Sequence, residues 1–203
     1  MWLKDFRLAG YDIYHLVACF LLFSVIGWIV ESIYMSFCNK KPTNRGFMTG
    51  PFCPIYGFGA TAGYIILHPL ANNIVALYVV GAALATIFEF LVAKLMMKLF
   101  GEVWWDYNDK FCNYKGVLCL ESTLAWGLYA VIIITFLFDK VMGLVDQYPV
   151  AWGIKTIVLV TALAAVDFGY HFAVSVKLDE DTKEDLKEKK DEIKELYRRL
   201  VRR

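Results

Sequence analysis

The stretch GWIVESIYMSFCNKKPTNRGFMTGPFCPIYGFG, residues 27–59, decides the fold of this chain. It starts inside a long apolar run, carries a carboxylate there at Glu31, and passes through a short basic loop. It then returns to apolar sequence through Gly50-Pro51 and Pro54. A helix needs about 20 apolar residues to cross a bilayer. The pattern therefore predicts an integral membrane protein that contains helical hairpins.

The composition supports a membrane protein. Of the 203 residues, 59% are apolar, which is more than a soluble domain of this length normally carries. The formal net charge is only +1, but residues 178–203 hold nearly half of all acidic and nearly half of all basic side chains. The five cysteines are an odd number without close paired spacing, so we expect no disulfide framework and no metal site. No cofactor is expected either.

Five membrane spans are expected within residues 1–177, which predicts an all-α, polytopic helix bundle. The expected spans are residues 14–37, 51–70, 74–100, 117–138 and 151–176. Glycine and proline in the second span allow close backbone approach or leave backbone groups free, so this segment either crosses the membrane or only re-enters it. Residues 178–203 are expected to form a cytoplasmic, charged amphipathic helix. Its apolar stripe at Leu186, Ile193 and Leu200 is either solvated or docks a partner.

The distribution of lysine and arginine predicts the orientation. With the C-terminus in the cytoplasm and five spans, the N-terminus lies outside, and the cytoplasmic loops then hold most of the basic residues. This arrangement satisfies the positive-inside rule. The cytoplasmic loop residues are Lys40, Lys41, Arg45, Lys98, Lys110 and Lys115. We expect a multi-pass protein of the bacterial inner (plasma) membrane.

Part of the opening stretch recurs later in the chain. Laying Gly46 on Gly116 also places Tyr56 on Trp126 and aligns the glycine that follows each aromatic residue. Two such copies, each with two spans, would share one orientation and be related by an axis along the membrane normal. The alternative is that helical hairpins with a glycine-rich second arm resemble one another without duplication.

Acidic residues within the expected spans are the main candidates for function. A carboxylate there costs about 2.5–3.5 kcal/mol on insertion scales, and it therefore usually faces the bundle interior or water. We expect Glu31, Glu89 and Glu121 to converge on an acidic, ligand-binding cavity that is open to the cytoplasmic side. The alternative is a structural role, such as capping a broken helix. The further candidate ligand-binding residues are Asn44, Arg45, Tyr56, Trp105, Asp106 and Asn113.

Asp167 and His171 lie four residues apart on one helix face and are candidates for a proton relay. A satisfied bond between helices is the alternative for this pair. Sequence motifs of P-loop ATPases, HExxH metalloproteases and GxSxG hydrolases are absent from the chain. The sequence thus favours a protein that is not an enzyme, and no catalytic residue is assigned.

The motifs also carry a family resemblance. The chain resembles the bacterial membrane proteins described as Putative ABC-transporter type IV, with the pattern W-x-x-E, N-x-G-x-x-x-G-P-x-x-P-[IL]-Y-G and W-D-Y followed by N-x-x-G. The matching residues are Trp28, Glu31, Asn44, Gly46, Gly50, Pro51, Pro54, Tyr56, Gly57, Trp105, Asp106, Tyr107, Asn113 and Gly116. The resemblance covers about residues 14–140 and implies a membrane component of a transport system. A cytoplasmic coupling loop of the kind that ABC permeases present to their ATPases is not recognisable.

Three functions follow as hypotheses. The first is a transport protein, or a transporter subunit, that binds a small ligand or ion in the acidic cavity. The second is a membrane-embedded enzyme acting on a lipid or lipid-linked substrate, and the third is a scaffold whose tail recruits a partner. The expected partners are the lipid bilayer, a transporter ATPase or another cytoplasmic protein at the C-terminal helix, and a second copy of the chain. Nucleic acid is not expected, because acidic residues balance the basic ones in the tail.

Overall fold

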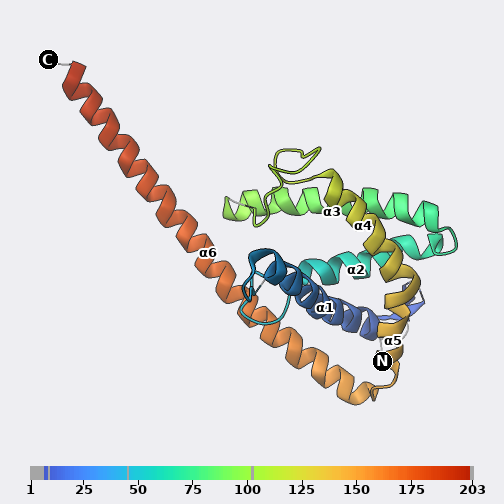
Figure 1. The fold of residues 1–203 in the computed structure, drawn as a ribbon. Helices are drawn as coiled ribbons and strands as arrows, with labels where there is room; N and C mark the ends of the chain where they lie inside the picture. The colour runs from blue at the N-terminus through green and yellow to red at the C-terminus, as the bar shows by residue number, and fades with distance from the viewer. Residues whose placement is uncertain (1–6, 9, 45, 102, 202–203) are drawn as a thin grey trace.

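The computed structural model describes residues 7–8, 10–44, 46–101 and 103–201, and side chains in this range up to residue 175. A short antiparallel β hairpin, β1 (Arg7–Leu8) and β2 (Tyr11–Asp12), precedes the helices. The helical elements in chain order are α1 (Ile13–Asn39), α2 (Pro54–Leu67), the 3-10 turn η1 (His68–Leu70), α3 (Ile74–Phe100), α4 (Leu120–Ile132), the π-helical turn η2 (Ile133–Leu137), α5 (Phe138–Asp146) and α6 (Val150–Val201) (Figure 1).

Four helical segments are long and apolar enough to cross a membrane. They are Ile13–Asn39, Ile74–Phe100, Leu120–Asp146 and Val150–Ser175, with mean hydropathies of 2.3, 2.2, 2.1 and 1.8. The expectation of an all-α membrane helix bundle is therefore confirmed. Four of the five expected spans fall on these segments, and the remaining one, residues 51–70, falls on α2 and η1.

Helix α2 is a half-length helix paired with half of α1. It has 14 residues and so measures only about 21 Å, against about 30 Å of bilayer hydrocarbon. It begins midway along α1, where the amide of Cys53 donates to the carbonyl of Ser24 (3.0 Å). Its other end reaches the start of α1, where the rings of Tyr64 and Tyr11 lie 5.7 Å apart. Residues 46–53 therefore return along the C-terminal half of α1 as irregular backbone, and α2 continues along the N-terminal half.

Side chains at the helix ends explain where the long helices begin. The carboxylate of Asp12 accepts from the amide of His15 (3.0 Å) and caps α1, and Asn73 caps α3 in the same way through the amide of Ala76 (3.0 Å). Gly101 ends α3 in the left-handed conformation (φ 75°), which glycine adopts without steric cost. The hairpin limits are thus set locally by short polar or glycine residues.

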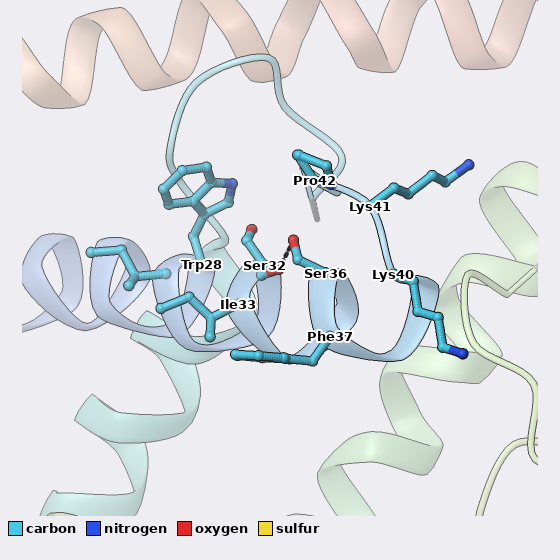
Figure 2. A pocket seen from close by; sticks show the side chains of 9 residues that line it. Trp28, Ser32, Ile33, Ser36, Phe37, Lys40, Lys41 and Pro42 are labelled. Atoms are coloured by element: carbon cyan, nitrogen blue, oxygen red, sulfur yellow. Dashed lines mark hydrogen bonds between the residues drawn. The ribbon is translucent and has the colours of Figure 1, made fainter.

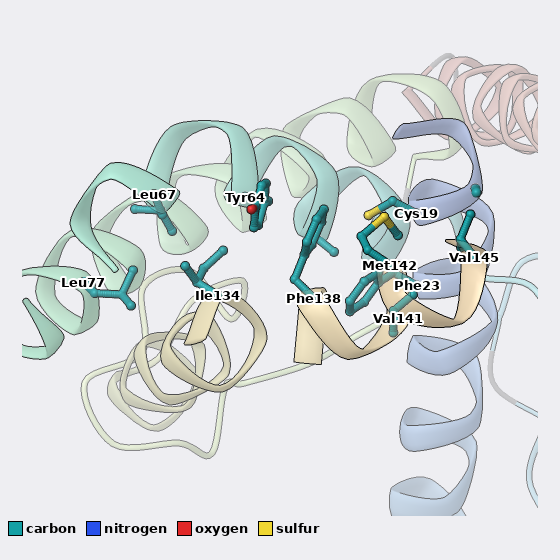
Figure 3. Packing of buried hydrophobic residues seen from close by; sticks show 12 residues of the cluster. Cys19, Phe23, Tyr64, Leu67, Leu77, Ile134, Phe138, Val141, Met142 and Val145 are labelled. Atoms are coloured by element: carbon teal, nitrogen blue, oxygen red, sulfur yellow. The ribbon is translucent and has the colours of Figure 1, made fainter. Parts of the chain in front are cut away.

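The largest buried apolar cluster joins the N-terminal half of α1 to α2 and α5. The ring of Phe138 stacks on Tyr64 with centroids 3.5 Å apart, and Phe23 stacks on the same phenylalanine at 6.0 Å (Figure 3). Met142 and Cys19 are fully buried beside these rings. This cluster fixes the half-helix α2 against the bundle and leaves the irregular residues 46–53 outside it.

Helix α6 is one continuous helix of 52 residues that contains both the expected fifth span and the expected charged tail. It begins beside the start of α1, where Tyr14 contacts Gly153, and then passes residues 46–53. It next contacts the end of α3, where the rings of Phe172 and Phe100 lie 5.8 Å apart, and beyond this contact it extends away from the other helices (Figure 1). The apolar stripe predicted at Leu186, Ile193 and Leu200 involves side chains outside the described ones.

Candidate functional site

Glu89 is a buried carboxylate at the centre of a polar cluster between α3, α4 and the loop that joins them. Its side chain accepts hydrogen bonds from Tyr107 Oη (3.1 Å), Trp126 Nε1 (3.1 Å) and Ser122 Oγ (3.3 Å). Only 6% of the residue is exposed. Ser122 reaches this position because α4 begins with a capping box between Cys119 and Ser122. Three uncharged donors thus compensate the carboxylate for lost water.

Glu31 lies beside this cluster on the first hairpin. A side-chain hydrogen bond joins it to Tyr56, whose ring lies 6.5 Å from the ring of Trp126. Burial first, and then the charges of Glu89 and Glu31, raise the pKa of the Tyr107 phenol above its ordinary value. Tyr107 therefore remains a hydrogen-bond donor at neutral pH. The two hairpins bring two glutamates, two tyrosines and a tryptophan together.

Glu121 lies apart from the cluster. Its carboxylate accepts from Lys110 Nζ (2.8 Å), and the two side chains are 60% and 48% exposed. That hydrogen bond and the charge of Glu121 raise the pKa of Lys110. Neighbouring residues on a helix point about 100° apart, so only Ser122, and not Glu121, faces Glu89. The structure does not bring the third glutamate to the other two.

Three of the other candidate residues build the loop that presents Tyr107. The indole of Trp105 donates to a backbone carbonyl of the same loop (2.9 Å). Asp106 accepts from the amide (2.9 Å) and the side chain (2.7 Å) of Asn108, and Asn113 donates to the carbonyl of Asn108 (2.9 Å). In the structure these side chains are occupied in holding the loop, and a ligand-binding role for them stays a prediction.

Asn44 lies in the loop between α1 and the irregular residues 46–53. It accepts from Trp28 Nε1 (2.7 Å) and donates to the carbonyl of Thr49 (3.4 Å). It therefore ties the loop after α1 to the side of that helix. Arg45, the neighbouring candidate, lies outside the described residues.

Asp167 and His171 contact the irregular segment rather than the glutamates. Asp167 accepts from the amides of Gly50 (2.9 Å) and Thr49 (3.3 Å). The Thr49 hydroxyl lies 2.7 Å from His171 Nε2, which is itself 3.3 Å from Asp167 Oδ1. This geometry ties residues 46–53 to α6, and a proton relay through the pair stays a prediction.

A family model described as Putative ABC-transporter type IV matches residues 18–172, well over half of the chain. The chain belongs to this family. This confirms the resemblance drawn from the GPFCPIYG motif and its neighbours. No curated protein and no solved structure matches the chain.

In this family member an open groove lies outside the glutamate cluster. It has a volume of about 690 Å³ and runs along the C-terminal half of α1, between Trp28 and Pro42 (Figure 2). Within the part of the chain that the structure describes, no group of three or more histidine, cysteine, aspartate or glutamate side chains could hold a metal ion.

Ser122 and Trp126 were not among the residues expected at the site. Their spacing of four residues was a usable signal, because it places both on one face of α4.

Proposed function

We propose that this chain is a membrane transport protein, or the membrane subunit of a transport system, and that Glu31 and Glu89 bind a proton or a small cation during transport. The supporting observation is the convergence of two intramembrane carboxylates on a shared aromatic cluster. Acids within membrane spans are costly, and they commonly mark ion pathways or proton relays. Membership of a transporter-related family supports the same function.

The two carboxylates occupy matching places in their hairpins, which supports an internal repeat. Glu31 is hydrogen-bonded to Tyr56 of the following helix, and Glu89 to Trp126 of the following helix. The sequence alignment of the two hairpins superimposes Tyr56 on Trp126, and Glu31 and Glu89 each lie late in the preceding helix. Two acids related by a repeat axis would offer a ligand two equivalent contacts.

Close glycine contacts support the same repeat. Gly57 of α2 packs on Phe20 of α1, and Gly127 of α4 packs on the ring of Tyr78 of α3. Each glycine directly follows the aromatic partner of its glutamate, and each aromatic ring precedes the glutamate of its own helix by the same number of residues. A chance resemblance between hairpins would not require this second set of contacts to match.

We place the lysine-rich ends of α1 and α3 at the cytoplasmic face of a bacterial inner membrane, with the N-terminus outside. Lys40, Lys41, Lys98 and Lys110 support this orientation through the positive-inside rule. Helix α6 then carries its charged part into the cytoplasm. There it would meet a transporter ATPase, another cytoplasmic protein, or a second copy of the chain.

The test is ligand-dependent stabilisation of the purified full-length protein. Unfolding temperatures are measured at a series of pH values and with Na⁺, K⁺, choline or spermidine, for the wild type and for Glu31→Gln and Glu89→Gln. A cation at 100 times its Kd stabilises the folded state by about 2.7 kcal/mol. Glu121→Gln is the matched control, because that carboxylate is exposed and paired with Lys110.

We expect one cation, or protonation, to stabilise the wild type and the control, and both cluster variants to lose that response. Proteoliposome uptake of the stabilising cation then tests transport itself. The proposal fails if Glu31→Gln and Glu89→Gln respond to pH and to all four cations as the wild type does.

A further inference from the structure

The groove along α1 has an apolar floor that the fold leaves uncovered. Ile29, Ile33 and Phe37 recur every four residues and so form one stripe on the helix, with 42%, 53% and 80% of each residue exposed. The stripe belongs to a helix that is long and apolar enough to cross a membrane. It therefore faces either lipid or a molecule that lies in the groove.

The groove is shaped by hydrogen bonds between α1 and the loop that follows it. Ser36 Oγ donates to the carbonyl of Ser32 (2.6 Å) and accepts from the amide of Thr43 (2.9 Å). Two turns nearer the N-terminus of α1, the indole Nε1 of Trp28 donates a hydrogen bond to the side-chain oxygen of Asn44 (2.7 Å). These bonds keep the loop against α1, so the groove is formed before any ligand arrives. Its volume of about 690 Å³ falls in the range typical of small-molecule pockets.

Positive charge stands at one end of the groove. Lys40 and Lys41 line it directly after α1 ends at Asn39, and both side chains are exposed. Among the residues that the structure describes, neither ammonium group forms an ion pair. Basic pockets beside the ends of membrane helices bind lipid head groups. The groove thus combines an apolar floor at membrane depth with two unpaired cations at its mouth.

We propose that this groove is a binding site for one anionic phospholipid of the surrounding bilayer. An acyl chain lies along Ile29, Ile33 and Phe37, and the phosphate contacts Lys40 and Lys41. The charge complementarity favours an anionic head group, because its net negative charge is attracted to the two ammonium groups, whereas the cation of a zwitterionic head group balances its own phosphate. The apolar stripe selects a lipid over a soluble anion, because a free phosphate ester buries none of it.

The test compares phosphatidylglycerol with phosphatidylcholine of the same acyl chains, titrated into the detergent-purified full-length protein and counted by native mass spectrometry. The double variant Lys40→Asn/Lys41→Gln removes both charges, and asparagine suits the left-handed backbone of Lys40 (φ 52°). We expect it to bind phosphatidylglycerol about 30-fold more weakly, at about 1 kcal/mol for each lysine near the membrane surface. Lys155→Gln, near the start of α6, is the matched control and should bind as the wild type does.

A second variant tests the floor of the groove. Phe37→Ser should weaken both lipids alike, and its exposed position makes misfolding a minor concern, which the unfolding temperature checks. The proposal is overturned if the double variant keeps the wild-type preference for phosphatidylglycerol. It is also overturned if glycerol 3-phosphate competes as well as the lipid, which would indicate a soluble anion. If either variant changes the fraction of dimer and leaves the amount of bound lipid unchanged, the groove is instead a contact with a second copy of the chain.

Discussion

Replacing Asp167 should destabilise the irregular segment that precedes α2. The carboxylate accepts from the amides of Gly50 (2.9 Å) and Thr49 (3.3 Å), on a part of α6 that belongs to a candidate membrane span. Within a bilayer, non-helical backbone is tolerated only where its polar groups find partners. Asp167→Ala leaves two amide donors without their acceptor. At a net contribution of about 0.5–1.5 kcal/mol for each hydrogen bond, we expect a loss of about 1–3 kcal/mol. Asp167→Asn keeps one acceptor oxygen and should lose about half as much.

The loss can be measured as the free energy of unfolding in mixed micelles of dodecyl maltoside and sodium dodecyl sulfate. Hydrogen exchange followed by mass spectrometry shows which part of the chain is destabilised. We expect faster exchange of the backbone amides in residues 46–53 and unchanged exchange in α3. Asp139→Asn is the matched control, since that carboxylate is exposed near the start of α5. The reasoning is refuted if Asp167→Ala leaves exchange in residues 46–53 unchanged, or if the control is equally destabilised.

Three further predictions follow from other contacts. Gly57→Ala should cost about 1–3 kcal/mol of unfolding free energy, because its Cβ meets the backbone of α1, whereas Gly63→Ala, with open space around it, should be neutral. Asp12→Ala should cost about 1 kcal/mol by removing the cap of α1. Burial raises the pKa of the Asp12 carboxyl, but hydrogen bonds from the first turn of α1 bring this pKa below its usual value. The pH-dependent contribution of the cap is therefore complete above about pH 4, the ordinary pKa of aspartate, and is lost as the pH falls through the lower pKa of the folded state. A pH titration of the unfolding free energy checks this. In intact cells, an impermeant maleimide should leave Cys38 and Cys112 unlabelled if the lysine-rich end is cytoplasmic, and should label both if it is not.

The helices and the family were predictable from local sequence. Apolar runs of sufficient length and the GPFCPIYG motif report directly on membrane crossing and on family membership. The start of α2 was not predictable, because it depends on a contact between Cys53 and Ser24, two residues far apart in the chain. The sequence left open whether residues 51–59 cross or re-enter, and the structure gives them an irregular part followed by a half-length helix. The irregular part is bound by Asp167 of α6, which lies more than a hundred residues further along the chain.

The composition of the glutamate cluster was only partly predictable. The cost of placing a carboxylate within a membrane span singled out Glu31 and Glu89 as candidates, and it singled out Glu121 equally. What separates them is helical phase, which depends on the residue at which α4 begins. Because Leu120 is the first helical residue, Ser122 faces Glu89 and Glu121 faces Lys110. A boundary uncertainty of one or two residues, normal for sequence-based prediction, is enough to exchange these roles.

The partners of the acids separate structural from functional roles. Asp167 accepts from two backbone amides, so releasing it requires backbone groups to lose their partners. Glu89 accepts only from side chains, and two of its donors are hydroxyl groups, on Tyr107 and Ser122. Hydroxyl donors can rotate away and be replaced by a cation or a proton while the backbone stays in place. Asp167→Asn should therefore lower stability and keep the response to pH and cations, whereas Glu89→Gln should lose that response. If the two variants lose the response together, the irregular segment and the cluster are coupled, and Asp167 has to be included in the binding site.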